Sequence, residues 1–380
     1  MGLKVVVDRG VVGAAEAFGG LGEVRLLPAV EMSPDTLRDA DVLVCRSTIR
    51  VGRELLDGSR VGFVATATIG IDHLDIPYLE SNGIGWASAP ACNADSVVQW
   101  VAAALLLMAA RTERELGELR VGIVGVGAVG SRVQKLLAAA GLPAPLLCDP
   151  PRARRESAVF STLDALLPEV DVLTLHVPLL TSGPDVTVRL LHQQRLGAMR
   201  PHAWVFNASR GEVVDGNALE AALVAGHLGG AVLDVWEGEP TPPPSLVRAC
   251  AAATPHIAGH SLEGKFNGTK QAYDAVCAYL GLRATWQPTL PATAPLSLSP
   301  RDKSDAALIL EAAAAGYRLD DDSQALVKIV GLPEGEVGAA FRRYRQNYPE
   351  RRELSSFILT FNPPCERVPE GLAALGARVC

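Results

Sequence analysis

The segment VGIVGVGAVG at residues 121–130 constrains the fold of this chain more than any other feature. It begins with apolar, partly β-branched residues, which are typical of a buried parallel strand. Three glycines with the spacing G-x-G-x-x-G follow, and a helix is predicted directly after them, over 131–140. Gly125 allows the tight turn, Gly127 lets a pyrophosphate approach the backbone, and Gly130 lets the helix pack on the strand. The pattern predicts a dinucleotide site with the phosphates at the helix N-terminus.

The residues beside this turn favour NAD as the dinucleotide. Ala128 and Val129 complete the turn and are expected to line the cofactor. A second apolar run, at 146–148, ends in Asp149, whose carboxylate suits hydrogen bonds to ribose hydroxyls and repels a 2′-phosphate. A lone glycine motif also occurs in ordinary α/β turns, so this acidic residue strengthens the prediction. Three basic residues nearby weaken the preference for NAD over NADP: Arg152, Arg154 and Arg155.

Composition limits the class of protein. The chain has 380 residues, 48% of them hydrophobic and 20% charged, as expected for two or three globular domains. A formal net charge of −7 gives no support for nucleic-acid binding. The apolar run 97–110 is too short for a membrane span, and the strand-like start leaves no room for a signal peptide. Seven cysteines without a C-x-x-C pair indicate reduced thiols. We expect a cytoplasmic protein with no metal site and no membrane partner.

Strand-like and helix-like segments alternate in two sets, which predicts an α/β protein with two doubly wound parallel sheets of Rossmann or flavodoxin-like type. A long apolar helix at 94–111 separates the sets, and a helix at 263–280 is expected to return to the first. A proline-rich linker then precedes a small α+β tail. The predicted strands are 4–7, 23–27, 42–45, 62–65 and 84–86, then 121–124, 146–148, 172–175, 204–207, 230–233 and 251–253. The predicted domains are 1–92 with 258–285, which face 93–257 across a deep cleft, and 286–380.

The segment NASRG at 207–211 follows a predicted strand of the second set. Ligands bind beyond the carboxyl ends of strands in such sheets, so Arg210 is expected to point into the cleft. Its guanidinium can bind a carboxylate through two parallel hydrogen bonds, which a lysine does poorly. A surface ion pair is the alternative interpretation of this arginine.

Two further strand ends carry LDVWEGEP at 233–240 and TPHIAGH at 254–260. Asp234 is expected near the nicotinamide or its ribose. Oxidation of a 2-hydroxy acid needs a cation for the carboxylate and a base for the hydroxyl proton, while a nicotinamide accepts the hydride. Arg210 and His256 supply these groups, and Glu239 supplies a carboxylate that orients the base. A solvated loop carboxylate and a structural histidine are the alternatives for Glu239 and His256.

With these motifs in order, the chain resembles the D-isomer-specific 2-hydroxyacid dehydrogenases. The resemblance implies that Arg210 binds the substrate carboxylate, that His256 is the acid–base group and that Glu239 is its partner. It also implies four further residues that line the NAD cofactor: Ala208, Ser209, Asp234 and Gly259.

Within that family the chain is most similar to the branch that oxidises 4-phosphoerythronate in the biosynthesis of pyridoxal phosphate. The motifs that carry this similarity are TATIGIDHLD at 66–75, ACNA at 91–94, LLCDPPR at 146–152, HIAGHSLEGK at 256–265 and YPERRE at 348–353. It implies a small phosphorylated 2-hydroxy acid as substrate, contacts from Ser47, Thr68 and position 260, and a homodimer formed through the tail. The ligand of the substrate phosphate stays open among Arg46, Lys265 and the partner subunit's Arg351 and the partner subunit's Arg352.

Several positions depart from that branch. His260 replaces a tyrosine that contacts the substrate; its reach is shorter and its charge varies with pH. Val177 replaces a threonine near the cofactor, and Asp95 is unusual at a helix start beside the cleft. The opening Asp8-Arg9-Gly10 lacks an acidic-Asn pair. These changes bear on affinity and turnover more than on reaction type.

Two other functions stay open. The first is a dehydrogenase for another D-2-hydroxy acid, of the phosphoglycerate or the glyoxylate/hydroxypyruvate type. The second is a non-catalytic binding protein that senses NAD. The tail and the SLEGK segment at 261–265 argue against the first, and the tail argues against the second.

Overall fold

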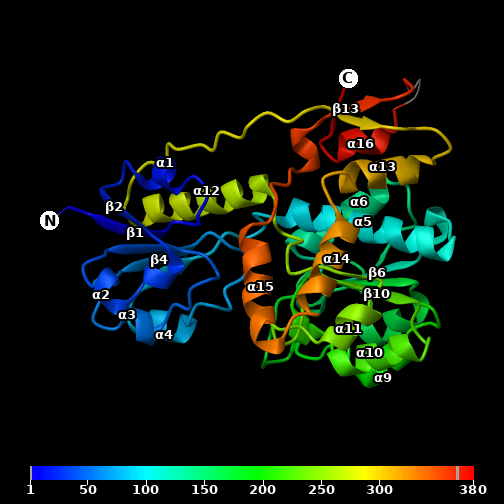
Figure 1. The fold of residues 1–380 in the computed structure, drawn as a ribbon, viewed down its shortest axis with the longest axis horizontal. Coiled ribbons are helices and arrows are strands. Elements are labelled where there is room, and N and C mark those ends of the chain that lie inside the picture. Colours follow the sequence, from blue (N-terminus) through cyan, green and yellow to red (C-terminus); the bar gives the residue numbers. More distant parts are fainter. Residues whose placement is uncertain (1, 365–367) are drawn as a thin grey trace. The chain divides into compact units, whose positions relative to one another are not determined.

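The computed structural model describes residues 2–364 and 368–380. The chain divides into two compact units (Figure 1). The first unit runs up to Asn93 and includes Ser261–Pro291, and the second consists of Ala94–His260 and Ala292–Cys380. The tail, which the sequence suggested as a module of its own from residue 286, thus belongs to the same compact unit as the glycine turn.

The first unit is built on a five-stranded parallel sheet with the order β2-β1-β3-β4-β5. The chain passes from β1 to one neighbour and then crosses to the other, so the switch point of the sheet lies between β1 and β3, where ligands bind in such folds. Each predicted strand is present to within one residue at either end. The strands are β1 (Lys4–Asp8), β2 (Glu23–Leu27), β3 (Val42–Cys45), β4 (Phe63–Thr66) and β5 (Gly85–Ala87).

Short helices with good start signals cover this sheet. The Ser33 hydroxyl accepts from the backbone of Thr36 in a capping box, and Asp75 caps the helix that follows β4. The helix that returns the chain to this unit begins after Ser261 and packs on β4 and α1. The helices of this unit are α1 (Ala14–Phe18), η1 (Ala29–Glu31), α2 (Pro34–Leu37), α3 (Arg53–Leu56), α4 (Ile76–Ser81) and α12 (Leu262–Tyr279).

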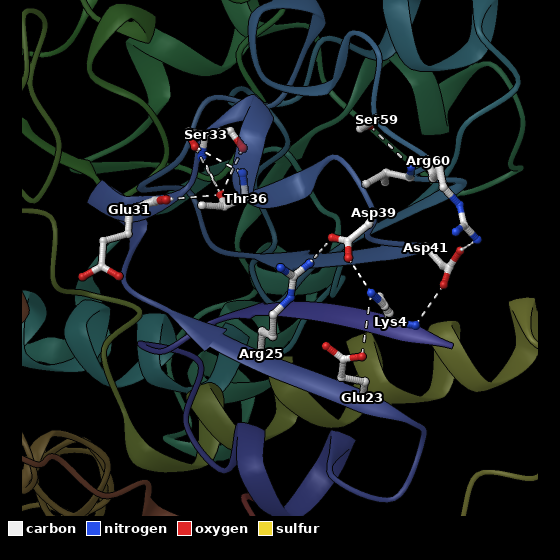
Figure 2. A network of polar contacts seen from close by, with 11 residues as sticks. Lys4, Glu23, Arg25, Glu31, Ser33, Thr36, Asp39, Asp41, Ser59 and Arg60 are labelled. Atoms are coloured by element: carbon white, nitrogen blue, oxygen red, sulfur yellow. Dashed lines mark hydrogen bonds and ion pairs between the residues drawn. The ribbon is translucent and has the colours of Figure 1, made fainter. Parts of the chain in front are cut away.

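A polar network lies at the amino ends of the strands, around the start of β1 and the segment just before β3, opposite the carboxyl ends where ligands bind (Figure 2). The Nζ of Lys4 lies 2.5 Å from an oxygen of Asp39, whose other oxygen accepts from Arg25 at 2.7 Å. The hydrogen bond from Lys4, with help from Arg25, lowers the pKa of Asp39 to about 2. These groups are partly exposed, so the network positions side chains more than it stabilises the unit.

The second unit contains a six-stranded parallel sheet with the order β11-β10-β9-β8-β6-β7. Its switch point lies between β6 and β8, beside the glycine turn. Five of the six predicted strands have the predicted bounds, and the sixth is one residue shorter. The strands are β6 (Val121–Val124), β7 (Leu146–Cys148), β8 (Val172–Leu175), β9 (Trp204–Asn207), β10 (Gly230–Leu233) and β11 (Ala252–Ala253).

The long helix α5 (Ala94–Thr112) packs against α6 (Ala128–Ala139) and buries Trp100 completely. Among the described residues, α5 alone is long and apolar enough to cross a membrane, and 61% of its apolar window is buried in the fold, as in core helices. Helix α6 begins three residues earlier than predicted, so Gly130 lies in its first turn. The other helices are η2 (Leu116–Glu118), α7 (Pro150–Ala153), α8 (Leu163–Leu166), η3 (Leu167–Glu169), α9 (Gln193–Ala198), η4 (Gly211–Val213), α10 (Gly216–Val224) and α11 (Pro244–Ala249).

The tail has its own three-stranded parallel sheet, with the order β12-β13-β14, but shares the core of the second unit. Its helices pack on α5, α6 and β11. Figure 1 shows α13 and α16 beside α5 and α6. Strand β11 is the edge of the large sheet, and the backbone N–H of Ala253 finds a partner in the Ser323 hydroxyl of the tail, at 3.0 Å. The tail elements are β12 (Leu296–Leu298), α13 (Asp305–Ala314), α14 (Leu319–Ile329), α15 (Glu334–Gln346), η5 (Leu354–Ser356), β13 (Ile358–Phe361), α16 (Glu370–Ala374) and β14 (Arg378–Val379).

Candidate active site

The glycine turn has the shape that a dinucleotide requires. Gly125 has φ +83°, and a Cβ there would lie 2.6 Å from the carbonyl oxygen of His176. A Cβ on Gly130 would lie 2.1 Å from the carbonyl oxygen of Gly125. A Cβ on Gly127, in contrast, would meet nothing within 4 Å. Gly127 caps α6 with no side chain in the way, so the free N–H groups of Ala128 and Val129 begin the helix beside open space that suits a pyrophosphate.

Asp149 follows β7 and is fixed by the backbone around it. One carboxylate oxygen accepts from the N–H of Val126 at 2.8 Å and the other from the N–H of Arg152 at 3.0 Å. Each oxygen keeps a lone pair for a ribose hydroxyl. The arginine side chains nearby are already engaged, Arg152 by Glu156 and Arg154 by Asp185. The charges of these two arginines are therefore compensated, which favours NAD over NADP at this strand end, while the third, Arg155, donates to the neutral carbonyl of Pro151.

Backbone hydrogen bonds join the three strand ends at which sequence analysis placed the chemistry. The N–H of Asp234 donates to the carbonyl of Asn207, and the N–H of His256 donates to the carbonyl of Asp234. Asn207 also donates from its side-chain amide to the carbonyl of Arg210 and accepts from Ser209. The turn after β9, which includes Ala208, therefore lies at the same sheet edge as the ends of β10 and β11.

Gly211 explains how the arginine turn approaches the loop that carries Glu239. A Cβ at Gly211 would lie 1.9 Å from the carbonyl carbon of Trp236, so only glycine permits this backbone contact. Arg210, directly before it, is partly buried and donates from Nη1 to the Ser209 carbonyl at 2.7 Å. The guanidinium is thus held by its own turn at the edge where β9, β10 and β11 end.

Glu239 and His256 form a hydrogen-bonded pair. The Oε2 of Glu239 lies 2.8 Å from the Nδ1 of His256, and its Oε1 accepts from the N–H of Trp236 at 2.9 Å. Burial raises the pKa of Glu239, but the charge and hydrogen bond of His256 outweigh burial, so the net pKa lies below the ordinary value. An ionised carboxylate fixes Nδ1 as a donor and leaves Nε2 as the nitrogen that can exchange a proton.

Asp234 is buried, with 1% of its surface exposed, and it holds the histidine loop in place. Its Oδ1 accepts from the Thr254 hydroxyl at 2.6 Å and from the N–H of Ile257 at 2.8 Å, and its Oδ2 accepts from the N–H of Ala258 at 2.9 Å. Burial raises its pKa, against these hydrogen bonds and the charge of His256. Sequence analysis expected this residue at the nicotinamide and missed its role in shaping the loop just before Gly259.

Thr254 is a second residue that sequence analysis passed over. Its hydroxyl accepts from the indole N–H of Trp100, and its carbonyl accepts from the indole N–H of Trp236. Buried tryptophans need such partners for their N–H groups. The sequence signal for this role was a threonine, Thr254, together with two tryptophans whose indole N–H groups need acceptors.

The predicted substrate residues of the first unit lie at the carboxyl edge of its own sheet. Ser47 follows β3 and is exposed, and Thr68 follows β4, with its hydroxyl 2.8 Å from that of Thr66. Arg46 pairs with the buried Asp8 at the end of β1, its Nε 2.8 Å from Oδ2. A Cβ at Gly10 would lie 1.8 Å from the Arg46 guanidinium. The unusual Asp8-Arg9-Gly10 sequence therefore supplies both the counter-charge and the space for Arg46.

Two other departures also have structural explanations. Asp95 at the start of α5 pairs with Arg132 of α6, at 2.9 Å. Val177 follows β8, and its Cγ1 would lie 2.9 Å from a Cβ on Gly125, so it packs under the glycine turn. Neither residue disturbs the Glu239–His256 pair.

One of the open candidates for the substrate phosphate is buried. Arg351 was a candidate ligand from a partner subunit, but it is 4% exposed inside the second unit. It donates to the Ala258 carbonyl and the Ser96 hydroxyl and lies over the Tyr317 ring at 4.1 Å. The apolar neighbours of the tail bury it, which the surrounding YPERRE sequence does not reveal. His260 lies in the same unit, with its ring 5.8 Å from that of Tyr348.

Comparison with known proteins agrees with this architecture. Residues 94–258 match the family model described as D-isomer specific 2-hydroxyacid dehydrogenase, NAD binding domain. The chain is 41% identical to an erythronate-4-phosphate dehydrogenase of Stutzerimonas stutzeri, over 99% of this chain and 100% of that protein. It is 44% identical to an erythronate-4-phosphate dehydrogenase of Salinibacter ruber, over 93% and 92% of the two chains.

Among solved structures, the fold is similar to a D-lactate dehydrogenase of Aquifex aeolicus in complex with NAD and lactic acid. That likeness has a TM-score of 0.61 at 25% identity and covers 73% of this chain and 95% of the other. The 2-hydroxyacid dehydrogenase fold, the glycine turn and the NAD-binding domain identify an NAD-dependent oxidoreductase. The chain belongs to the erythronate-4-phosphate dehydrogenases of the D-isomer-specific 2-hydroxyacid dehydrogenase family.

Proposed function

We propose that this protein oxidises 4-phospho-D-erythronate to (R)-3-hydroxy-2-oxo-4-phosphooxybutanoate with NAD, in the biosynthesis of pyridoxal 5′-phosphate. The 2.8 Å hydrogen bond between Glu239 and His256 is the observation that supports the proposal most. It orients a base at the carboxyl edge of the sheet that also carries the glycine turn. The near full-length similarity to erythronate-4-phosphate dehydrogenases supports the choice of substrate.

In the proposed reaction each site residue has a separate role. Arg210 binds the substrate carboxylate through two hydrogen bonds and so fixes the orientation of C2. The Nε2 of His256 removes the proton from the oxygen of the C2 hydroxyl, and Glu239 stabilises the imidazolium that forms. Gly127 and Asp149 would hold NAD, whose nicotinamide would accept the hydride from C2. Asp234 keeps the histidine loop in shape, and Ala208, Ser209 and Gly259 line the cofactor.

The first unit supplies the remaining substrate contacts in this proposal. Ser47 and Thr68 offer hydroxyl groups, and His260 of the second unit takes the place of a tyrosine. For the phosphate, Arg46, Lys265 and the partner subunit's Arg352 remain the candidates. The Arg46 guanidinium uses two of its donors on Asp8 and keeps others for an anion.

The test is a spectrophotometric assay. Purified protein is mixed with NAD and 4-phosphoerythronate in the presence of a carbonyl trap, and the absorbance of reduced nicotinamide is followed. We expect turnover with this substrate and little with 3-phosphoglycerate or D-glycerate. Faster turnover of another D-2-hydroxy acid would identify that acid as the substrate instead. Tight NAD binding without turnover of any acid would indicate an NAD sensor.

The organisation of the protein is also part of the proposal. The first unit would bind substrate, residues 93–257 would bind NAD, and the tail would form a homodimer interface in the cytoplasm. Six described cysteines are outside any disulfide, which agrees with a reducing compartment. Light scattering after size-exclusion chromatography should give twice the chain mass of 40.0 kDa. A monomer at micromolar concentration would contradict the dimer.

A further inference from the structure

The loop at 254–260, which carries His256, is held through its backbone from two sides. On one side Asp234 accepts from the N–H groups of Ile257 and Ala258, and its own carbonyl accepts from the N–H of His256. These contacts come from β10, the neighbouring strand of the sheet. The carbonyl groups of His256 and Ala258 receive no donor from this strand and need donors of their own.

The tail supplies those donors as two arginines. The Nε of Arg345, near the end of α15, donates to the carbonyl of His256 at 3.2 Å. Arg351 donates to the carbonyl of Ala258 at 2.7 Å, together with the Ser96 hydroxyl. The two residues that flank Ile257 therefore have their carbonyl groups fixed by residues 89 and 93 positions further along the chain.

The conformation of His256 explains why such support matters. Its φ is +55°, in the left-handed region that a residue with a side chain rarely adopts. Such a conformation persists when the surroundings fix it, and it is frequent at functional sites. Here the N–H and the carbonyl of the same residue are both bonded, so rotation about the backbone would break contacts on both sides.

Helix α15 also lies close to the partner of the histidine. A Cβ on Gly338, two turns before Arg345, would meet Pro240 at 3.3 Å, next to Glu239. Two charged groups act on the His256–Glu239 pair. Asp234 interacts with His256, and Arg345 contributes to the lowered pKa of Glu239. Arg345 therefore contacts the backbone of His256 and acts electrostatically on Glu239.

We propose that Arg345 is a positioning residue of this enzyme, which fixes the backbone of His256 and sets the charge around the His256–Glu239 pair from the tail. This inference rests on the proposed role of His256 as the base. It assigns the tail a part in catalysis in addition to any part in assembly.

The substitution Arg345→Gln tests it, with Arg345→Lys as the conservative variant. Arg343→Gln, at an exposed position of the same helix, is the matched control. We expect Arg345→Gln to lower kcat by about 10- to 100-fold with little change in KM, because the base is displaced. Loss of the cation favours the imidazolium, so the acidic limb of the rate profile should move to higher pH. Arg345→Lys should keep the pH profile and recover part of kcat.

A titration of the His256 imidazole by ¹H–¹³C NMR gives a readout that does not need turnover. Its midpoint should move to higher pH in Arg345→Gln and stay in place in Arg345→Lys and Arg343→Gln. An unchanged midpoint with unchanged kcat would overturn the proposal. A higher KM for 4-phosphoerythronate with unchanged kcat would also overturn it, since Arg345 would then hold the substrate.

The same data separate this inference from the proposed function. If the wild-type protein oxidises no hydroxy acid, the proposed function fails, and the NMR midpoints still decide whether Arg345 acts on His256. If Arg345→Gln does not fold, as judged by near-UV circular dichroism, then Arg345→Lys and Arg345→Met provide the comparison with retained and removed charge.

Discussion

The Oε2 of Glu239 lies 2.8 Å from the Nδ1 of His256, although the two residues are 17 positions apart in the sequence, with α11 and β11 between them. Two backbone hydrogen bonds prepare this approach, one from the N–H of Trp236 to Glu239 and one from the N–H of His256 to the carbonyl of Asp234. The pair is therefore fixed by its surroundings before any substrate binds, as a general base with an oriented ring requires.

Glu239→Gln should lower kcat for 4-phosphoerythronate by about 10²- to 10⁴-fold, because the amide cannot stabilise the imidazolium. Loss of the anion should move the acidic limb of the rate profile to lower pH, opposite to the effect of Arg345→Gln. Steady-state rates between pH 6 and 10 measure both, and NADH binding followed by fluorescence serves as the control. A variant with more than half of the wild-type kcat would remove Glu239 from the mechanism.

Arg210→Lys should reduce kcat/KM by about 10- to 100-fold, since lysine loses one of two parallel hydrogen bonds to the carboxylate. The affinity for NADH should stay near the wild-type value. Substrate and NADH titrations on the same preparation separate the two effects. An equal loss of NADH affinity would mean that Arg210 serves the cofactor.

Gly127→Ala should lower the affinity for NADH, whereas Gly130→Ala should lower the stability of the fold. A Cβ at Gly130 would lie 2.1 Å from a backbone oxygen, so this variant should lose about 1–3 kcal/mol of stability. A Cβ at Gly127 meets open space, so the fold should persist while NADH affinity falls by about tenfold or more. Thermal unfolding and NADH fluorescence titration distinguish them. Equal affinity in Gly127→Ala and wild type would place the pyrophosphate elsewhere.

His176 should make the protein sensitive to mild acid. Burial lowers the pKa of His176 to about 3, and its Nδ1 is buried without a hydrogen-bond partner. Below pH 6.5 the unfolded chain binds a proton that the folded chain does not, so stability falls as pH decreases from 6.5 toward 3. The loss reaches about 2 kcal/mol at pH 5.

The substitution His176→Gln should remove this part of the pH dependence, because glutamine does not titrate. Urea unfolding at pH 7 and pH 5 measures it, and His202→Asn at an exposed position is the control. If the difference between the two pH values is the same in His176→Gln and wild type, His176 is protonated in the folded protein.

Much of the fold was predictable because it depends on local patterns. Apolar runs of four or five residues predicted the strands of both large sheets, with bounds within one residue. The caps of α2 and α4, Ser33 and Asp75, are equally local, since a cap depends on three neighbouring residues. Helix α6 began earlier than expected because Gly130 belongs to its first turn, and the turn needs only Gly125 and Gly127.

The part of the candidate site that lies within sequence motifs was predictable. The sequence placed Glu239 and His256 after neighbouring strands, and parallel strands bring such positions to one edge. It did not indicate that Asp234 shapes the histidine loop, because that role depends on which backbone N–H groups point at the carboxylate. It also suggested that Arg351 was free for a partner subunit, whereas the fold buries it.

The sequence by itself determined the family of fold, the dinucleotide turn and the residues that carry the chemistry, because strand, turn and cap signals are local. Only the tertiary structure decided that the tail packs with the NAD-binding unit and that Arg345 supports the backbone of His256. Those contacts join positions 70 and 89 residues apart, and they depend on the edge of the sheet at β11 and on carbonyl groups that need donors. No local pattern encodes that need.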